Sequence, residues 1–305
     1  MNRRQFTSLL GAAAASRITA LAAPSPQRFY FAVIADTHII DEFYKGPEGN
    51  PLDTETIFKT GERLAAARDF INSLNPPMER VFLVGDYFHN YPSAEWDFYF
   101  QHKTRVDRAL ELTSAFKMPV HAGFGNHDYA VPRVSREFSH NLFQQKFGLK
   151  PYYSVDYKDF KFIHLNNFIG DTWNPKSAIY DKGQGSLGEE QLNWLEAELA
   201  QRKPTFVFIH FPLRICLDVE VKDYGLHPLL RKYSDSIQRV ISGHWHKWYD
   251  FARTFGPPHW VMAATRYDED AYMLIEVDRK AVTHRVLNLD EIGWSTHYSR
   301  PYHPA

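Results

Sequence analysis

Short apolar runs recur along the chain, and each ends at a polar motif. Arg28 to Ala35 is almost continuously hydrophobic and ends at Asp36, and Val81 to Val84 ends at Gly85-Asp86. Short unbroken apolar runs of this kind are typical of strands buried on both faces. The pattern therefore predicts buried strands that carry polar groups at their carboxyl ends. Three further runs fit the same description: Met118–Ala122, Thr205–Ile209 and Ile237–Ser242.

The segments between these runs show helical spacing or hairpin signals. Thr54 to Leu74 carries apolar residues at helical spacing, and Asn75-Pro-Pro77 ends it. A strand, loop, helix, strand rhythm predicts α/β layers. Two more helices are expected over 94–116 and 133–147, and a hairpin over 152–156 and 160–166. Three sequential, antiparallel strands are expected over 260–264, 271–277 and 282–289.

Gly183 to Gly188 matches the glycine pattern G-x-G-x-x-G, but its context excludes a dinucleotide site. No strand precedes it, and no acid ends a strand about 20 residues later. We interpret Ser186 and Glu189 as a capping box that opens a helix through Leu199. The chain has no internal repeat or linker, so we expect one domain over residues 24–305.

Composition excludes several classes of protein. Of 305 residues, 44% are hydrophobic and 23% charged, which argues against disorder. The formal net charge of −1 and the lack of a basic stripe argue against a nucleic-acid partner and an exonuclease. The single cysteine, Cys216, excludes an internal disulfide framework.

The amino terminus, Met1 to Ala23, is predicted to be an export signal. Arg3-Arg4-Gln5-Phe6, followed by Leu9-Leu10, resembles a twin-arginine signal, and Ala20-Leu21-Ala22 suits a signal peptidase. The apolar stretch is shorter than the roughly 20 residues that a membrane-spanning helix needs. We therefore expect passage through the twin-arginine export machinery, no stable membrane insertion, and a periplasmic or otherwise exported protein. An amphipathic surface helix is the alternative.

Five polar motifs follow the apolar runs and carry the side chains that divalent metals need. Aspartate supplies a hard oxygen that can bridge two ions, histidine a borderline nitrogen, and asparagine a neutral oxygen. Each motif alone is weak evidence, but the joint pattern predicts a site for two transition-metal ions, divalent or trivalent, with Mn, Fe or Zn preferred. The motifs are Asp36-Thr-His38, Gly85-Asp86, Gly125-Asn126-His127-Asp128, His210 and Gly243-His244-Trp-His246.

This motif set resembles the calcineurin-like metallophosphoesterase superfamily, over about Phe29 to Leu289. The resemblance implies an α/β fold, a four-layer sandwich of two mixed β-sheets flanked by α-helices, with a dinuclear centre at one edge. It implies that His127 is catalytic and that Asp128 orients its ring. It also implies the metal ligands: Asp36, His38 and His246 for one ion, Asn126, His210 and His244 for the other, and Asp86 bridging both.

His89 departs from the pattern of the superfamily. Three residues after the bridging aspartate many members have an acid or a tyrosine, and this chain has histidine. Without a tyrosine there, the chain lacks the ligand that colours purple acid phosphatases, so we do not assign it to that branch. We interpret His89 as a candidate contact to the substrate.

The expected chemistry follows from the charges. Two divalent ions facing Asp36 and Asp86 leave a pocket of about +2, which attracts a small-molecule phosphate ester. Ions about 3.5–4 Å apart can share a hydroxide that attacks phosphorus, and a protonated His127 stabilises or protonates the leaving alkoxide. We predict a phosphodiesterase. A phosphomonoesterase of the same fold is the alternative, and a non-catalytic metal-binding pseudoenzyme or sensor is a remote one.

Overall fold

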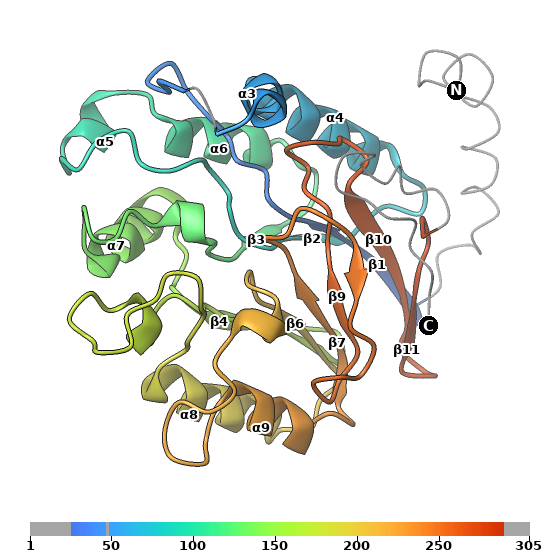
Figure 1. Cartoon of the computed structure of the whole chain (residues 1–305). Coiled ribbons are helices and arrows are strands. Elements are labelled where there is room, and N and C mark those ends of the chain that lie inside the picture. The colour runs from blue at the N-terminus through green and yellow to red at the C-terminus, as the bar shows by residue number, and fades with distance from the viewer. Residues whose placement is uncertain (1–25, 47–48, 290–305) are drawn as a thin grey trace.

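The computed structural model describes residues 26–46 and 49–289, in which two β-sheets pack face to face (Figure 1). The predicted export signal, Met1 to Ala23, lies outside the described residues. Helices cover the outer side of each sheet, so the layers run helix, sheet, sheet, helix (Figure 1). The predicted fold class is confirmed.

The first sheet has the strand order β11-β10-β1-β2-β3 and is mixed. Its strands β1, β2 and β3 run parallel, whereas β10 is antiparallel to both β1 and β11. The carboxyl ends of the three parallel strands therefore meet at one edge. The bounds are β1 Arg28–Ile34, β2 Arg80–Leu83, β3 Val120–Ala122, β10 Tyr272–Asp278 and β11 Thr283–Val286.

The second sheet has the order β4-β5-β6-β7-β9-β8 and is also mixed. Its β4–β5 hairpin was predicted, and β5, β6, β7 and β9 run parallel. The expectation that segment 260–264 starts a run of sequential antiparallel strands was wrong, because β9 pairs with β7 in this sheet. The bounds are β4 Tyr153–Tyr157, β5 Phe160–His164, β6 Thr205–Phe208, β7 Ile237–Ser242, β8 Tyr249–Asp250 and β9 His259–Val261.

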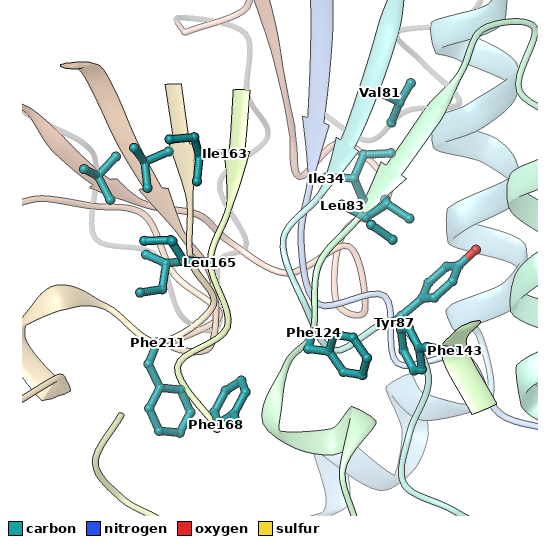
Figure 2. Close-up of a cluster of buried hydrophobic side chains, with 14 of the residues drawn as sticks. Ile34, Val81, Leu83, Tyr87, Phe124, Phe143, Ile163, Leu165, Phe168 and Phe211 are labelled. Atoms are coloured by element: carbon teal, nitrogen blue, oxygen red, sulfur yellow. The ribbon is translucent and has the colours of Figure 1, made fainter. Parts of the chain in front are cut away.

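Both faces of the central strands are buried, which explains their unbroken apolar sequence. Along β1, alternate residues such as Phe31 face the second sheet, where the Phe31 and Phe206 ring centroids lie 5.0 Å apart. The intervening residues, such as Ile34, join the clusters under the helices. Figure 2 shows this outer set, with Ile34 and Leu83 from the first sheet and Ile163 from the second.

The helices are shorter than their apolar patterns predicted. Segment 54–74 forms two helices, because Lys59 leaves helical geometry at ψ 1°. Segment 94–116 divides at Thr104, whose backbone N–H donates to the Asp107 carboxylate. The helices are α3 Pro51–Ile57, α4 Thr60–Ser73, α5 Phe98–Gln101, α6 Arg105–Ser114, α7 Arg136–Phe147, α8 Glu189–Leu199 and α9 Leu226–Lys232, with 3₁₀ turns η1 Asn126–Asp128, η2 Asp171–Trp173 and η3 Leu213–Ile215.

The predicted capping box at the start of α8 is not formed. Ser186 instead exchanges a side-chain hydrogen bond of 2.6 Å with Thr172. The backbone N–H groups of Leu187 and Gly188 donate to the carboxylate of Glu220, which comes from a distant loop. Sequence spacing cannot reveal a cap that tertiary structure supplies. Among the described residues, no helix combines the length and the apolar character needed to cross a membrane.

Candidate metal centre

All five motifs lie at the carboxyl ends of parallel strands, where open α/β sheets place their chemistry. Asp36 and His38 follow β1, Asp86 follows β2, and η1 follows β3. In the second sheet His210 follows β6, and His244 and His246 follow β7. Backbone hydrogen bonds join the loops: the His38 N–H donates to the Asp86 carbonyl at 2.9 Å, and the Gly243 N–H to the His210 carbonyl at 3.0 Å.

The side chains form two groups that share Asp86. In each group the candidate ligand atoms lie within 4.8 Å of one another. One group is Asp36, His38, Asp86 and His246, and the other is Asp86, His210 and His244. Asn126 joins the second group, because its Oδ1 lies 3.1 Å from His210 Nε2. The structure thus brings together all seven residues that the sequence predicted as ligands, while their roles as ligands stay predictions.

The Asp86 carboxylate lies where the two groups meet. Its Oδ1 accepts the His127 backbone N–H at 2.8 Å. Its Oδ2 is buried without a hydrogen-bond donor, 3.1 Å from His210 Nε2 and 3.4 Å from His38 Nε2. Burying such an oxygen is costly unless something compensates for its lost hydration. A cation bound by either group would do so, and therefore these residues fit a pair of metal ions that share Asp86.

The histidine rings are oriented for ligation through Nε2. His210 Nδ1 lies 3.0 Å from the Val84 carbonyl, which can only accept a hydrogen bond, so Nδ1 carries a proton and Nε2 is the nitrogen that a metal ion would bind. The Nε2 atoms of His38 and His246 face each other at 3.2 Å. Two imidazole lone pairs at that distance repel unless a proton or a metal ion lies between them.

The electrostatics suit a cation. Burial lowers the pKa of His244, with help from neighbouring His210, to about 3. Burial also lowers the pKa of His38, and the Asp86 carboxylate does not compensate. Burial acts in the same direction on His210, but there the Asp86 and Asp36 carboxylates prevail and raise the pKa to about 9. The site therefore combines neutral imidazoles at His38 and His244 with carboxylates that stabilise a positive charge, which a protonated His210 carries when no metal ion is bound.

The backbone at the site is strained. Asp36, His38, Asp86, His244 and His246 all have left-handed φ angles, between 46° and 68°. A residue with a Cβ pays about 1–2 kcal/mol for this conformation. Strain of this kind persists where the surrounding structure imposes it, and it clusters at functional sites. Here it turns the side chains of tight loops towards one point.

Two glycines of the motifs are required because neighbouring ligand loops approach them closely, not because of turn geometry. A Cβ on Gly125 would lie 2.1 Å from the Asp86 nitrogen and 2.3 Å from its Oδ1. A Cβ on Gly243 would lie 2.4 Å from Asp36 Oδ2. Both distances are shorter than any van der Waals contact, so these glycines let the ligand loops pack against one another.

His127 is half-buried beside the two groups, and its ring is held by Asn90. His127 Nδ1 lies 3.0 Å from Asn90 Oδ1, and the Asn90 backbone N–H donates to the His127 carbonyl at 3.1 Å. The amide oxygen can only accept, so Nδ1 carries a proton and Nε2 is the atom available to substrate. Sequence analysis missed Asn90 because its segment, His89 to Ser93, shows only the pattern of a loop.

Asp128 was expected to hold the His127 ring directly, and in the structure it does not. Its buried carboxylate accepts backbone N–H groups from Gly125, Tyr87 and Phe88 at 2.8–3.1 Å. Burial and the Asp86 carboxylate together raise the pKa of Asp128. Asp128 thus joins η1 to the loop after β2 and affects His127 only through the backbone. A catalytic role for Asp128 stays a prediction.

His89 is buried behind the first group. Its Nδ1 lies 3.0 Å from His38 Nδ1, and its ring stacks on His127 with centroids 4.6 Å apart. It can therefore accept the Nδ1 proton of a His38 that ligates through Nε2. Contact between His89 and substrate stays a prediction. Arg266 is buried as well, and its Nη2 donates to the Asp53 carbonyl at 3.2 Å.

Comparison with known proteins decides the family. The profile of the family described as calcineurin-like phosphoesterase matches residues 29–248. The chain belongs to the calcineurin-like phosphoesterase family. Membership of this family implies a metal-dependent phosphoric ester hydrolase.

Two similar proteins illustrate the range of this family. A protein of Arcobacter nitrofigilis described as a probable glycerophosphodiester phosphodiesterase GpdQ is 29% identical over 189 residues, which are 58% of this chain and 60% of that protein. The chain therefore spans less than two thirds of that relative. The crystal structure of a dimetal phosphatase from Danio rerio superimposes with a TM-score of 0.56 at 18% identity, covering 85% of this chain and 98% of the other.

Proposed function

We propose that the protein is an exported phosphodiesterase with a dinuclear metal centre. The observation that carries the proposal is the Asp86 carboxylate, whose Oδ2 faces histidines from both ligand groups without a hydrogen-bond donor. One ion would be held by Asp36, His38 and His246, the other by Asn126, His210 and His244, with Asp86 common to both. When bound, the ions would supply Lewis acidity for the phosphoryl oxygens and lower the pKa of a nucleophilic water.

The chain's own residues have separate tasks in this proposal. The ligand loops hold the candidate metal-binding side chains at the edge where the two sheets meet. His127 holds a proton on Nδ1 through Asn90, and its Nε2 stabilises or protonates the oxygen that leaves phosphorus. Asn90 and Asp128 are positioning residues, since Asn90 acts through the His127 ring and Asp128 through the backbone of η1.

The diester is preferred over the monoester because of the glycerophosphodiesterase named among the relatives. That relative is matched over only 60% of its length, and the metal site itself acts on either kind of ester. Phosphomonoester hydrolysis is the second candidate. We also propose that residues 24–305 form one domain and that Met1 to Ala23 directs export by the twin-arginine route.

The reaction is tested on metal-stripped protein reloaded with manganese, with bis-p-nitrophenyl phosphate and p-nitrophenyl phosphate as substrates. We expect the diester to be preferred and two metal ions to bind per chain. Asp86→Asn should lower the metal content, whereas Asp159→Asn, at an exposed turn, should leave it at two. Preference for the monoester would move the protein to the phosphatases. Failure with both esters under every metal would favour the non-catalytic alternative.

Export is tested by fractionating cells that express the full chain. We expect the mature protein outside the cytoplasm, with an amino terminus near residue 24 by mass spectrometry. Changing Arg3 and Arg4 together to lysine should retain it in the cytoplasm. Export that persists in this double variant would rule out the twin-arginine route.

A further inference from the structure

A pocket of about 380 Å³ opens beside the metal centre, between the loop after the first ligand motif and the loop after Asp86. Phe43, Tyr44 and Lys45 line one wall, and His89, Asn90 and Arg105 belong to the opposite side. None of these residues is a predicted metal ligand, and the pocket is large enough for a substituent the size of a small ring.

The pocket is continuous with the residue that handles the leaving group. His89 stacks on His127 with an interplanar angle of 23°, and Asn90 Oδ1 lies 3.0 Å from His127 Nδ1. Both lining residues therefore contact His127 directly. An alcohol that leaves phosphorus next to His127 would therefore be close to two residues that line this pocket.

Aromatic rings form the accessible wall. The edge of Tyr44 meets the His89 ring, with centroids 5.8 Å apart, and the Phe58 ring, with centroids 5.7 Å apart. Phe58 is 60% exposed, which is unusual for so large an apolar side chain. Phe58 and Tyr44 thus extend the pocket outward as an aromatic rim that a planar substituent could stack on.

The charge of the pocket is positive. Of the described residues that line it, two are cations and none is acidic. Arg105 is neutralised by Asp41, whose Oδ1 lies 2.8 Å from its Nη2. Lys45 is exposed at the rim and supplies the remaining positive charge.

We propose that this pocket binds the alcohol part of the phosphate ester and selects neutral or anionic alcohols that carry a flat ring over cationic ones. This proposal rests on the proposed phosphodiesterase function, because the natural substrate would then be a diester that contains such an alcohol. It assigns Tyr44 to stacking and Lys45 to the rejection of ammonium groups.

The test compares three diesters of glycerol 3-phosphate that differ only in the second alcohol: benzyl, methyl and choline. The benzyl ester carries a neutral ring, the methyl ester is too small to reach the rim, and the choline ester is cationic. We expect the wild type to prefer benzyl to methyl and choline. Tyr44→Ala should lower the benzyl-to-methyl ratio of kcat/KM about tenfold, mainly through KM, since stacking on an aromatic ring is worth that much.

Charge is tested separately. Lys45→Glu should raise the choline-to-methyl ratio about fivefold, the scale expected for an exposed charge that is reversed. Tyr249→Ala and Lys222→Glu are matched controls, because both residues are exposed and neither lines the pocket. Unchanged ratios in the Tyr44 and Lys45 variants, or equal changes in the controls, would overturn the proposal.

Binding gives a readout that does not depend on turnover. Benzylphosphonate and methylphosphonate, whose carbon–phosphorus bonds resist hydrolysis, are titrated calorimetrically into the manganese-loaded protein. We expect benzylphosphonate to bind about tenfold tighter to the wild type and to lose this advantage in Tyr44→Ala. If that holds while no diester is hydrolysed, the pocket stands and the phosphodiesterase proposal fails. If diesters are hydrolysed but the benzyl advantage is missing, the pocket proposal fails alone.

Discussion

At the scale of single residues, the sequence predicted the candidate ligands but not the residues that position the groups around them. Asp36, His38, Asp86 and the histidines after β7 could be predicted because their types and spacing carry metal chemistry. Asn90 could not, since asparagine in a loop is ordinary turn chemistry. Its role depends on the approach of η1 from a different strand, as its hydrogen bond to His127 shows.

Asn90→Ala should therefore lower kcat on a diester with a poor leaving group, by about 10-fold or more, with little change in KM. His127 would lose the acceptor that fixes its tautomer, while the ligand groups stay intact. Steady-state kinetics and a pH–rate profile measure the effect. Asn90→Asp, which keeps an acceptor oxygen, should recover much of the loss. An Asp variant as slow as the Ala variant would contradict a positioning role.

At the scale of elements, the buried strands were predictable and the ends of helices were not. An unbroken apolar run such as Arg28–Ala35 indicates a strand that is buried on both faces, whatever its position in the sheet. Helix α8 shows the limit, because its amino-terminal N–H groups are satisfied by Glu220 rather than by Ser186. No local pattern encodes a partner more than 30 residues away.

Glu220→Ala should lower the free energy of unfolding by about 1–3 kcal/mol, the usual cost of leaving buried backbone donors without their acceptor. Two backbone donors at the start of α8 would lose their acceptor. Chemical denaturation of the variant and the wild type measures the difference. Glu189→Ala, in the exposed first turn of the same helix, is the control, with an expected change within about 0.5 kcal/mol. Equal losses in both variants would show that charge near the helix, not the cap, matters.

At the scale of the whole molecule, the packing of sheets and helices covers histidines that are not part of the metal centre: His164 on β5 and His140 on α7. Burial lowers the pKa of His164 to about 3, and that of His140 to about 4. In the unfolded chain both titrate near 6.5, at about the ordinary value. Such packing depends on which elements lie next to each other in the fold. Because the hydrophobic pattern of the sequence misplaced even β9, the buried surroundings of these histidines could not be predicted from it.

The contribution of these two histidines to the stability of the metal-free protein should therefore be fully present above about pH 6.5 and fall as the pH decreases from there towards 3. Below pH 6.5 the unfolded chain binds protons that the folded protein excludes. Denaturant unfolding at a series of pH values measures the slope. His164→Phe should reduce it, because Phe cannot be protonated and His164 already stacks on Phe208. His102→Gln, at an exposed position, should leave the slope unchanged. An unchanged slope in His164→Phe would contradict this account.

Each ligand group draws on both sheets, and this gives the metals a mechanical role. Asp36, His38 and Asp86 extend from the first sheet, whereas His210, His244 and His246 extend from the second. Each bound ion would thus cross-link the two sheets at the edge where their loops meet. A chelator would then act as a mild denaturant, lowering the melting temperature in proportion to the binding free energy that is lost. Under a pulling force, the two sheets of the metal-free protein would separate first at this edge.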